Sequence, residues 1–314
     1  MSGDGFMSAK SLYRIRNWSQ YNRSLFDRGN ITVWFSPDAI NGWTAKRSTT
    51  GRGRPQEYSD AAIESCLVLR SLFQLPLRAT QGFAEGMIQL LDLDVDAPDY
   101  TLLCKRASGL KIALQALPAK GRINIVVDST GLKIFGEGEW KTRCHGKAKR
   151  RSWRKLHLAI NPDSHEIVGC ALTSERTHDC EKIDDILPNQ RLNEVCADGA
   201  YDNEKSYEAI SKRGGIPLIP PRSGAAKTKN PSPGMVLRNH TVEACWAIGL
   251  GNWKHGPNYH QRSLAETAMF RFKTILGSRL ASRKSGNQLA ESLIKAQIIN
   301  RMTQFGMPES YRKS

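Results

Sequence analysis

Three acidic residues occupy positions from which their carboxylates could meet. Asp128 directly follows the apolar run Ile123–Val127, Asp198 follows Glu194–Ala197, and Glu266 comes later on a helical pattern. Neighbouring strands of a sheet lie about 4.8 Å apart, so carboxylates at two strand ends can share metal ions. Magnesium prefers oxygen ligands, and two such ions about 3.5–4 Å apart stabilise both the attacking and the leaving oxygen of a phosphoryl transfer. The spacing therefore predicts a metal site that suits this chemistry.

The segment around Glu266 carries further polar side chains at helical spacing. At about 100° per residue, Tyr259, Arg262, Glu266 and Lys273 fall within about 60° of one another on a helix surface. One interpretation is a solvated face with Glu–Arg and Glu–Lys pairs, worth roughly 0.2–0.5 kcal/mol each. The tyrosine in this stripe instead favours a face that meets a substrate. The apolar residues predicted on the opposite, buried side are Leu264, Ala268, Phe272 and Ile275.

Each aspartate taken alone has a simpler interpretation. A lone aspartate after an apolar strand usually caps a loop, which applies to Asp128 and Asp198 alike. Asp202 competes with Asp198, but its place before a helical pattern favours an N-cap of that helix. Catalysis is therefore predicted from the set of three carboxylates and not from any one of them.

The elements that would position these carboxylates form an α/β pattern. The continuous β-branched run 123–127 is typical of a central buried strand. Three early strands followed by alternating helix and strand is the element order of an RNase H-like domain, which we predict for residues 119–314 together with C-terminal helices. An exposed loop is predicted over 225–234. The predicted strands are 123–127, 132–135, 156–160, 167–172, 194–197 and 216–219, and the predicted helices are 180–187, 203–213, 259–276 and 287–302.

The first residues, 1–57, are predicted to form a basic and aromatic arm with a linker. Arginines and aromatics lie close together between Tyr13 and Arg23, and 49–55 is typical of a flexible basic link. Two interpretations stay open, because such a segment can cover the body as a surface helix or contact DNA phosphates and bases.

Residues 58–118 are predicted to form a mainly helical region. Ser59 can cap a first helix, which Pro76 ends. A second helix over about 78–91 and a third from about Pro98 resemble a helix-turn-helix module that binds DNA, although compact three-helix units also occur as plain structural domains. The side chains predicted to face inward include Phe73, Leu90 and Leu91, and those predicted to face outward, toward DNA, are Lys105 and Arg106.

The net charge favours a polyanionic partner. Lys and Arg number 46 against 30 Asp and Glu, giving +16, and displaced counterions drive such proteins onto phosphate backbones. The seven cysteines are scattered without zinc-ligand spacing, and the histidines form no helical zinc pair. No signal-peptide run and no apolar stretch of about 20 residues is found, which favours the bacterial cytoplasm, in association with the nucleoid, and excludes a membrane partner.

The segment 141–155 is the most basic in the chain, with Trp140 and Trp153 at its ends. Beside the Asp128 strand it would form a rim that holds DNA phosphates. The alternative is a mobile solvated loop, but the two tryptophans supply apolar anchors and favour DNA contact. The DNA-binding residues predicted here include Lys141, Arg143, Arg150, Arg151 and Arg154.

Several motifs together resemble the DDE transposases of bacterial insertion sequences, and most of all the insertion-sequence-five family. The tyrosine, arginine, glutamate and lysine of the 259–273 stripe match the signature helix of these enzymes. The other motifs that carry the resemblance, which spans nearly the whole chain, are Tyr21-Asn22-Arg23, Asp128-Ser129-Thr130-Gly131-Leu132-Lys133, Glu137-Gly138-Glu139-Trp140, Trp153-Arg154-Lys155-Leu156-His157-Leu158 and Asp198-Gly199-Ala200-Tyr201-Asp202.

The resemblance implies an RNase H-like core, two divalent ions, Mg²⁺ or Mn²⁺, in each active site, and transposon-end DNA as the substrate. Asp128, Asp198 and Glu266 take the metal-binding places of the family. Tyr259, Arg262 and Lys273 take places that position DNA phosphates. Cys104-Lys105-Arg106 departs from the family pattern, because a more polar start is expected for a recognition helix, and this weakens the DNA-reading role of the helical region.

The function that follows is that of a homodimer or higher oligomer bound to the terminal inverted repeats of an insertion sequence. Hydrolysis would free a 3′-hydroxyl at each element end, and that hydroxyl would then attack target DNA. Two rival hypotheses remain from the sequence. A non-catalytic DNA-binding regulator would bind without metal-dependent cutting, and a different RNase H-like nuclease would cut without joining to a target.

Overall fold

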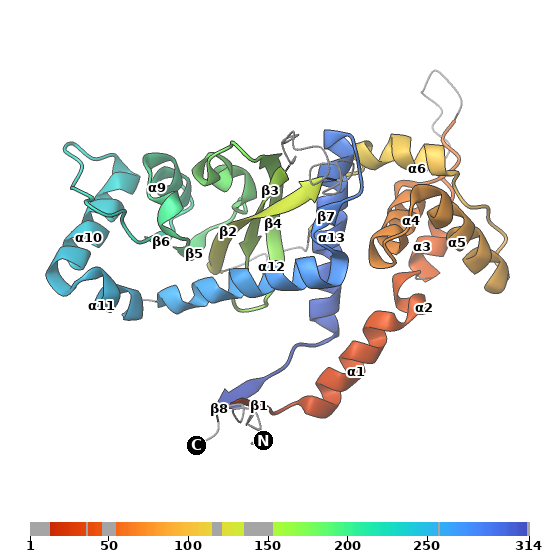
Figure 1. Ribbon diagram of the computed structural model, residues 1–314, viewed down its shortest axis with the longest axis horizontal. Helices are drawn as coiled ribbons and strands as arrows, with labels where there is room; N and C mark the ends of the chain where they lie inside the picture. The colour runs from red at the N-terminus through yellow and green to blue at the C-terminus, as the bar shows by residue number, and fades with distance from the viewer. Residues whose placement is uncertain are drawn as a thin grey trace, which may run out of the picture.

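A computed structural model describes residues 13–35, 37–45, 55–114, 121–134, 153–256 and 258–312. Figure 1 shows a mixed α/β body built around one sheet, a group of N-terminal helices beside it, and an arm where the two ends of the chain meet. The predicted flexible link up to residue 54, the motif 137–140 and residues 141–152 of the basic segment 141–155 lie outside the described residues. Within the described ranges no helix is long and apolar enough to cross a membrane.

The central sheet has the strand order β4-β3-β2-β5-β6, and β7 pairs with β2 outside this path. β3 runs antiparallel to both of its neighbours, β2 and β4, whereas β5, β6 and β7 join by parallel pairing. This mixture of strands and helices is compatible with an RNase H-like core. The strands are β2 (Ile123–Ile134), β3 (Trp153–Ile160), β4 (Ile167–Ser174), β5 (Leu192–Cys196), β6 (Ile216–Leu218) and β7 (Arg279–Leu280).

β2 is longer than the sequence predicts. A turn was expected between 127 and 132, but β2 continues through Asp-Ser-Thr-Gly without a break. Antiparallel pairing with β3 runs from Val126↔Ile160 to Lys133↔Trp153 and supplies the backbone hydrogen bonds that hold this stretch extended. Asp128 therefore lies within a strand and not at its end, which corrects the predicted position.

Alternation along β2 divides the hydrophobic core into two clusters. Val126 and Leu132 pack on one face, together with residues of α12 (Ser263–Leu276) and α13 (Ser285–Phe305). Ile125 and Val127 pack on the other face. The helices that cover this second face are α8 (Ile183–Ile186), α9 (Glu204–Ser211) and the start of α10 (Pro233–Ile248).

The N-terminal helices pack onto α13, and the predicted helix starts are confirmed. Ser59 caps α4, accepting a hydrogen bond from the backbone N–H of Ala62, and Asp99 caps α6 in the same way. The inward faces were partly wrong, because the exposed fractions are 47% for Phe73, 79% for Leu90 and 37% for Leu91. These helices are α1 (Trp18–Gly29), α2 (Ile31–Trp34), α3 (Pro37–Asn41), α4 (Asp60–Leu72), α5 (Leu77–Leu90) and α6 (Tyr100–Arg106), followed by the 3-10 turn η1 (Ala107–Gly109).

Two helices between β6 and α12 were not predicted. α10 begins at the end of the loop expected over 225–234, and no element was predicted for the rest of α10 or for α11 (Leu250–His255). They form one end of the molecule, next to α9 (Figure 1). Gly234 allows α10 to begin close to α9, since a Cβ there would lie 2.6 Å from the backbone carbon of Tyr207.

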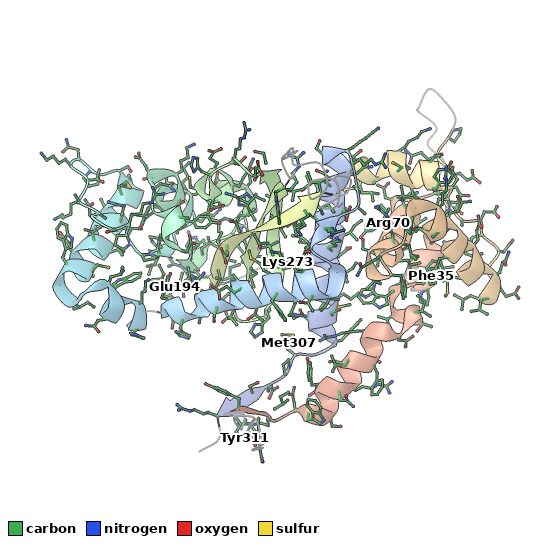
Figure 2. All side chains as sticks on the ribbon, viewed as in Figure 1. Phe35, Arg70, Glu194, Lys273, Met307 and Tyr311 are labelled. Carbon is green, nitrogen blue, oxygen red and sulfur yellow. The ribbon has the colours of Figure 1, made fainter. Side chains whose placement is uncertain are left out.

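The two ends of the described chain meet in a short arm. β1 (Tyr13–Ile15) pairs antiparallel with β8 (Ser310–Arg312), and the amide of Asn17 donates to the carbonyl of Met307 over 3.0 Å. Figure 2 marks Met307 and Tyr311 on the segment that leads from α13 into this arm. The last helix is therefore tied to the first residues of the fold.

Candidate active site

Asp128 lies at a gap in the sheet. On the edge of β2 opposite β3, pairing with β5 ends at Val126↔Cys196 and pairing with β7 begins at Lys133↔Arg279. Among the described residues no strand covers this edge between the two. The side chain of Asp128 is 16% exposed, and one of its oxygens accepts the backbone N–H of Ser129 over 2.7 Å.

Asp198 lies level with Asp128 across this gap. Each aspartate follows the paired residues Val126 and Cys196 by two positions, and the two strands run parallel. Asp198 also caps the 3-10 turn η3 (Gly199–Tyr201), because its side chain accepts the N–H of Ala200 over 2.9 Å. The predicted proximity of the two aspartates follows from this register, although only Asp198 stands at a strand end.

Glu266 approaches the aspartates through an arginine. The guanidinium of Arg262 forms an ion pair with Glu266, and its other terminal nitrogen lies 3.8 Å from a carboxylate oxygen of Asp128. Arg262 thus places one positive charge between the helical carboxylate and the strand carboxylate. The Glu–Arg pair weighed as an alternative is present, and it lies within reach of Asp128 rather than on a separate solvated face.

The pKa of Asp128 also indicates that Asp198 and Glu266 lie near it. Burial, followed by repulsion from Asp198 and Glu266, raises the pKa of the Asp128 carboxyl, while the N–H of Ser129 and the charge of Arg262 oppose this rise. Two neighbouring anions are therefore close enough to disfavour ionisation of Asp128. A cation placed between them would relieve that repulsion.

The three carboxylates suit a hard divalent cation in their chemistry, but Glu266 does not lie together with the two aspartates. All three candidates offer carboxylate oxygens, which Mg²⁺ and Mn²⁺ accept. Across the described ranges, no three His, Cys, Asp or Glu side chains stand in position to hold one metal ion. Glu266 is 54% exposed at its side chain and is engaged by Arg262. The residues fit the ions in chemistry, with Asp128 and Asp198 level and Glu266 held to one side.

The sequence predicted one regular helix that carries Tyr259, Arg262 and Glu266, but the first two residues do not belong to it. They lie on the 3-10 turn η4 (Asn258–Arg262), and α12 begins at Ser263. Tyr259 is half-buried, with its ring 5.8 Å from that of Trp253. The stripe therefore bends at its start, and only Glu266 and Lys273 share the α-helix.

Lys273 faces the sheet, and its ammonium donates to the hydroxyl of Thr130 over 2.5 Å. Figure 2 labels this lysine on α12 beside the sheet. Thr130 belongs to β2, two residues beyond Asp128. Lys273 thus places a positive charge on the same strand, two residues along from Asp128.

The other predicted DNA contacts have different outcomes. Lys141, Arg143, Arg150 and Arg151 lie outside the described residues. Arg154, on β3, donates to the side chain of Gln288 on α13 over 2.9 Å. It also lines a depression of about 260 Å³ beside β2, which includes Ser129–Gly131, Lys155 and Glu175. A larger cavity of about 570 Å³ lies between α4 and α13, away from the carboxylates.

The two basic residues that were predicted to face DNA from the helical region differ in their exposure. Lys105 is exposed on α6, as predicted. Arg106 is not directed outward, because its guanidinium bonds the carboxylate of Asp60 and the carbonyl of Tyr58, and its side chain is only 14% exposed. The outward direction predicted for Arg106 is therefore wrong, since the exposed carboxylate of Asp60 and the carbonyl of Tyr58, at the start of α4, hold its guanidinium against the fold.

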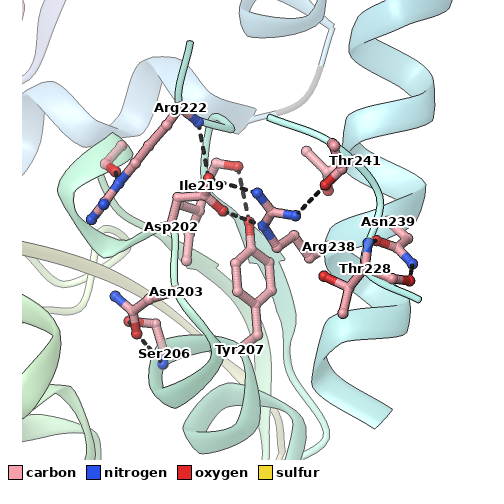
Figure 3. A network of polar contacts seen from close by, with 12 residues as sticks. Asp202, Asn203, Ser206, Tyr207, Ile219, Arg222, Thr228, Arg238, Asn239 and Thr241 are labelled. Atoms are coloured by element: carbon pink, nitrogen blue, oxygen red, sulfur yellow. Dashed lines mark hydrogen bonds and ion pairs between the residues drawn. The ribbon is translucent and has the colours of Figure 1, made fainter. Parts of the chain in front are cut away.

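Asp202 is a structural residue, but not the predicted N-cap. Asn203 caps α9, whereas Asp202 is 6% exposed and lies beneath the loop that carries Asp198. Figure 3 shows Arg238 of α10 reaching Asp202, with nitrogen–oxygen distances of 2.7 and 3.1 Å. The N–H of Arg222 adds a bond of 2.9 Å, and its guanidinium donates to the carbonyls of Gly199 and Ala200.

Arg238 was missed because α10 was not predicted, and Arg222 was missed because it lies before that helix, outside any regular element. A signal was available, since Ser232-Pro233 opens a helix and Met235, Asn239 and Val242 repeat at a spacing of four and three residues along its buried side. Together the two arginines hold the turn that follows Asp198, Arg238 from α10 and Arg222 from the segment between β6 and α10. This network fixes the backbone from which the second carboxylate projects.

Comparison with known families defines the class of protein. Residues 119–300 match a family model described as a transposase DDE domain, and residues 26–137 match a second model with the same description. The first match spans more than half of the chain and includes all three candidate carboxylates. The chain therefore belongs to the family of transposase DDE domains, in the group of insertion-sequence DDE transposases. Its role is that of a transposase.

Proposed function

We propose that this transposase binds the terminal inverted repeats of an insertion sequence, cleaves DNA at the element ends and transfers the freed 3′-hydroxyl strands into target DNA. It would act as a metal-dependent polynucleotidyl transferase and endonuclease of the insertion-sequence-five family, with an RNase H-like core. The carrying observation is that Arg262 lies between Asp128 and Glu266 while Asp198 stands level with Asp128.

Asp128, Asp198 and Glu266 are proposed to hold two Mg²⁺ or Mn²⁺ ions. Such ions would lower the pKa of an attacking water and stabilise charge on the phosphodiester. Arg262 is proposed to leave Glu266 for a DNA phosphate, since a guanidinium binds phosphate in a bidentate manner. Glu266 would then turn toward the aspartates. Tyr259 and Lys273 are proposed to line the path of the DNA beside Arg262, together with Arg154 on β3.

We also propose a role for each of three segments of the chain. Residues 1–57 would form an arm with a linker, 58–118 a helix-turn-helix-like region that contacts DNA through Lys105, and 119–314 the catalytic domain with its C-terminal helices. Two inverted repeats at the ends of an element favour a homodimer or higher oligomer on DNA. The net charge of +16 supports a polyanionic partner and association with the bacterial nucleoid.

The test is incubation of the purified protein with labelled element ends, a plasmid target and Mg²⁺ or Mn²⁺. Wild type should cut the ends and join them to the plasmid. Asp128→Asn should abolish both steps while end binding survives. Asp163→Asn is the matched control, because Asp163 is exposed on the β3–β4 turn. Cutting without joining would favour a different RNase H-like nuclease. Binding without cutting would favour a non-catalytic regulator. Full activity of Asp128→Asn would refute the assigned active site.

A further inference from the structure

A fourth carboxylate lies behind Asp128, on the other face of the sheet. Asp179 begins the 3-10 turn η2 (Asp179–Lys182) after β4, and its side chain is only 18% exposed. One of its oxygens accepts the hydroxyl of Ser129 over 2.7 Å and lies 3.1 Å from the ammonium of Lys155. Asp179 is therefore linked to the residue that directly follows Asp128.

Ser129 connects the two carboxylates through its two donors. Its backbone N–H donates to Asp128 over 2.7 Å, and its hydroxyl donates to Asp179 over 2.7 Å. Successive side chains of a strand point to opposite faces, so the catalytic carboxylate and the Ser129 hydroxyl lie on opposite sides of β2. A constraint on the Ser129 side chain therefore reaches the peptide group that holds Asp128.

This constraint acts where β2 is least supported. On the side of β5 and β7, the stretch of β2 around Asp128 has no strand partner among the described residues. Main-chain ladder bonds therefore hold this stretch only from β3. The bond between Ser129 and Asp179 is a second restraint, supplied from the turn that follows β4.

The neighbouring side chains hold Asp179 in place. Lys155 is anchored by the carbonyl of Thr177 over 2.8 Å. His157 is fully buried, its Nδ1 lies 3.8 Å from Asp179, and burial lowers its pKa to about 4, so the ring is neutral near pH 7. Burial, aided by the charges of Asp179 and Asp128, raises the pKa of the Tyr201 phenol. Lys155 is thus the cation that balances Asp179.

Two buried polar atoms beside Asp179 also lack hydrogen-bond partners within the described part of the chain. They are Nδ1 of His157 and the hydroxyl of Tyr201. Buried polar atoms normally have hydrogen-bond partners, and each exception calls for an explanation. A purely structural ion pair between Lys155 and Asp179 leaves both atoms unexplained.

We propose that Asp179 is a positioning residue for Asp128, acting through the hydroxyl and peptide of Ser129. This rests on the proposed function, since Asp128 is taken as a metal ligand. Asp179 itself touches neither metal nor DNA. Its carboxylate holds Ser129 in the rotamer that keeps the Asp128 carboxylate turned toward Asp198 and Glu266.

The test compares metal affinity across variants of the full chain. Free Mn²⁺ is measured by electron paramagnetic resonance in a titration of the protein, alongside the Mn²⁺ concentration that gives half-maximal cleavage. Groups that orient metal ligands typically contribute 10–100-fold to affinity. Asp179→Ala and Ser129→Ala should each weaken Mn²⁺ binding about tenfold, and the double variant should be no weaker than the weaker single variant. The rate at saturating Mn²⁺ should fall much less.

Two further variants separate positioning from folding. Asp179→Asn keeps an oxygen that accepts the Ser129 hydroxyl, and it should bind Mn²⁺ within about threefold of wild type. Asp185→Ala is the matched control, because Asp185 lies on α8 with a 56% exposed side chain paired to Lys182, and it should bind as wild type does. Urea unfolding checks that each variant folds. If Asp179→Ala does not fold, Ser129→Ala alone decides.

Unchanged Mn²⁺ affinity in Ser129→Ala, or additive losses in the double variant, would overturn the proposal. Asp128→Asn distinguishes this from failure of the proposed function. If Asp128→Asn loses Mn²⁺ while Ser129→Ala does not, the metal site stands and the positioning role is wrong. If Asp128→Asn binds Mn²⁺ as well as wild type, the assigned metal site is itself wrong, and the positioning role is lost with it.

Discussion

The ion pair between Arg238 and Asp202 should decide whether the loop after Asp198 stays in place. Asp202 is 1% exposed at its side chain and Arg238 is 11% exposed, so Arg238→Met leaves a buried anion without its counterion. Loss of one partner of a buried pair costs about 3–5 kcal/mol. Because Asp202 still accepts the hydrogen bond from the backbone N–H of Arg222, the lower end of this energy range applies. We expect a loss of about 3 kcal/mol in unfolding free energy and a fall of about 6–12 °C in Tm.

The assay is urea unfolding followed by tryptophan fluorescence, in a double-mutant cycle with Asp202→Asn. Each single variant should be destabilised, and the double variant should recover at least about 1 kcal/mol relative to the sum of the two losses. Arg176→Met is a control, because Arg176 is exposed between β4 and η2. A loss below about 0.5 kcal/mol in Arg238→Met, or strict additivity of the two changes, would refute the reasoning. The cleavage activity of each variant should decrease in the same order as its unfolding free energy.

Three other changes have defined outcomes. Lys273→Met should weaken DNA binding and reduce the slope of log affinity against log salt by about one, if its ammonium leaves Thr130 for a phosphate; an unchanged slope would exclude that contact. Gly234→Ala should destabilise the fold by about 1–3 kcal/mol in urea titrations, since its Cβ would meet the backbone of Tyr207 at 2.6 Å. Asp128→Asn should stabilise the metal-free protein at pH 7. The raised pKa of Asp128 means that its contribution to stability is present below the ordinary value of 3.8 and lost as pH rises, so the gain should vanish in acid.

Much of the sheet could be predicted from the sequence. The apolar run ending at Val127, the hairpin of β3 and β4, and β5 before Asp198 all have the pattern of buried strands, and the structure confirms them. The level positions of Asp128 and Asp198 followed from these strands. Local sequence sufficed here because the apolar residues that define each strand are also the ones that form the core.

Where contacts distant in sequence decide the structure, prediction was wrong. Asp-Ser-Thr-Gly after Val127 has the composition of a turn, yet pairing with β3 keeps it extended. The position of Arg106 depends on Asp60, which lies 46 residues earlier in the chain. The 3-10 geometry of Tyr259 and Arg262 depends on packing against α11, a helix that the sequence pattern did not indicate. Spacing alone could not reveal these arrangements.

The place of α13 has a consequence for synthesis on the ribosome. This helix, the last among the described residues, supplies the core against which α4 packs and also covers β4. At about 5–20 residues per second, translation from Leu72 to Phe305 takes roughly 12–47 s. During that interval the apolar side of α4 has been made but its permanent cover has not. A message truncated before residue 285 would therefore yield an aggregation-prone fragment without a finished core, so full-length translation precedes any native product.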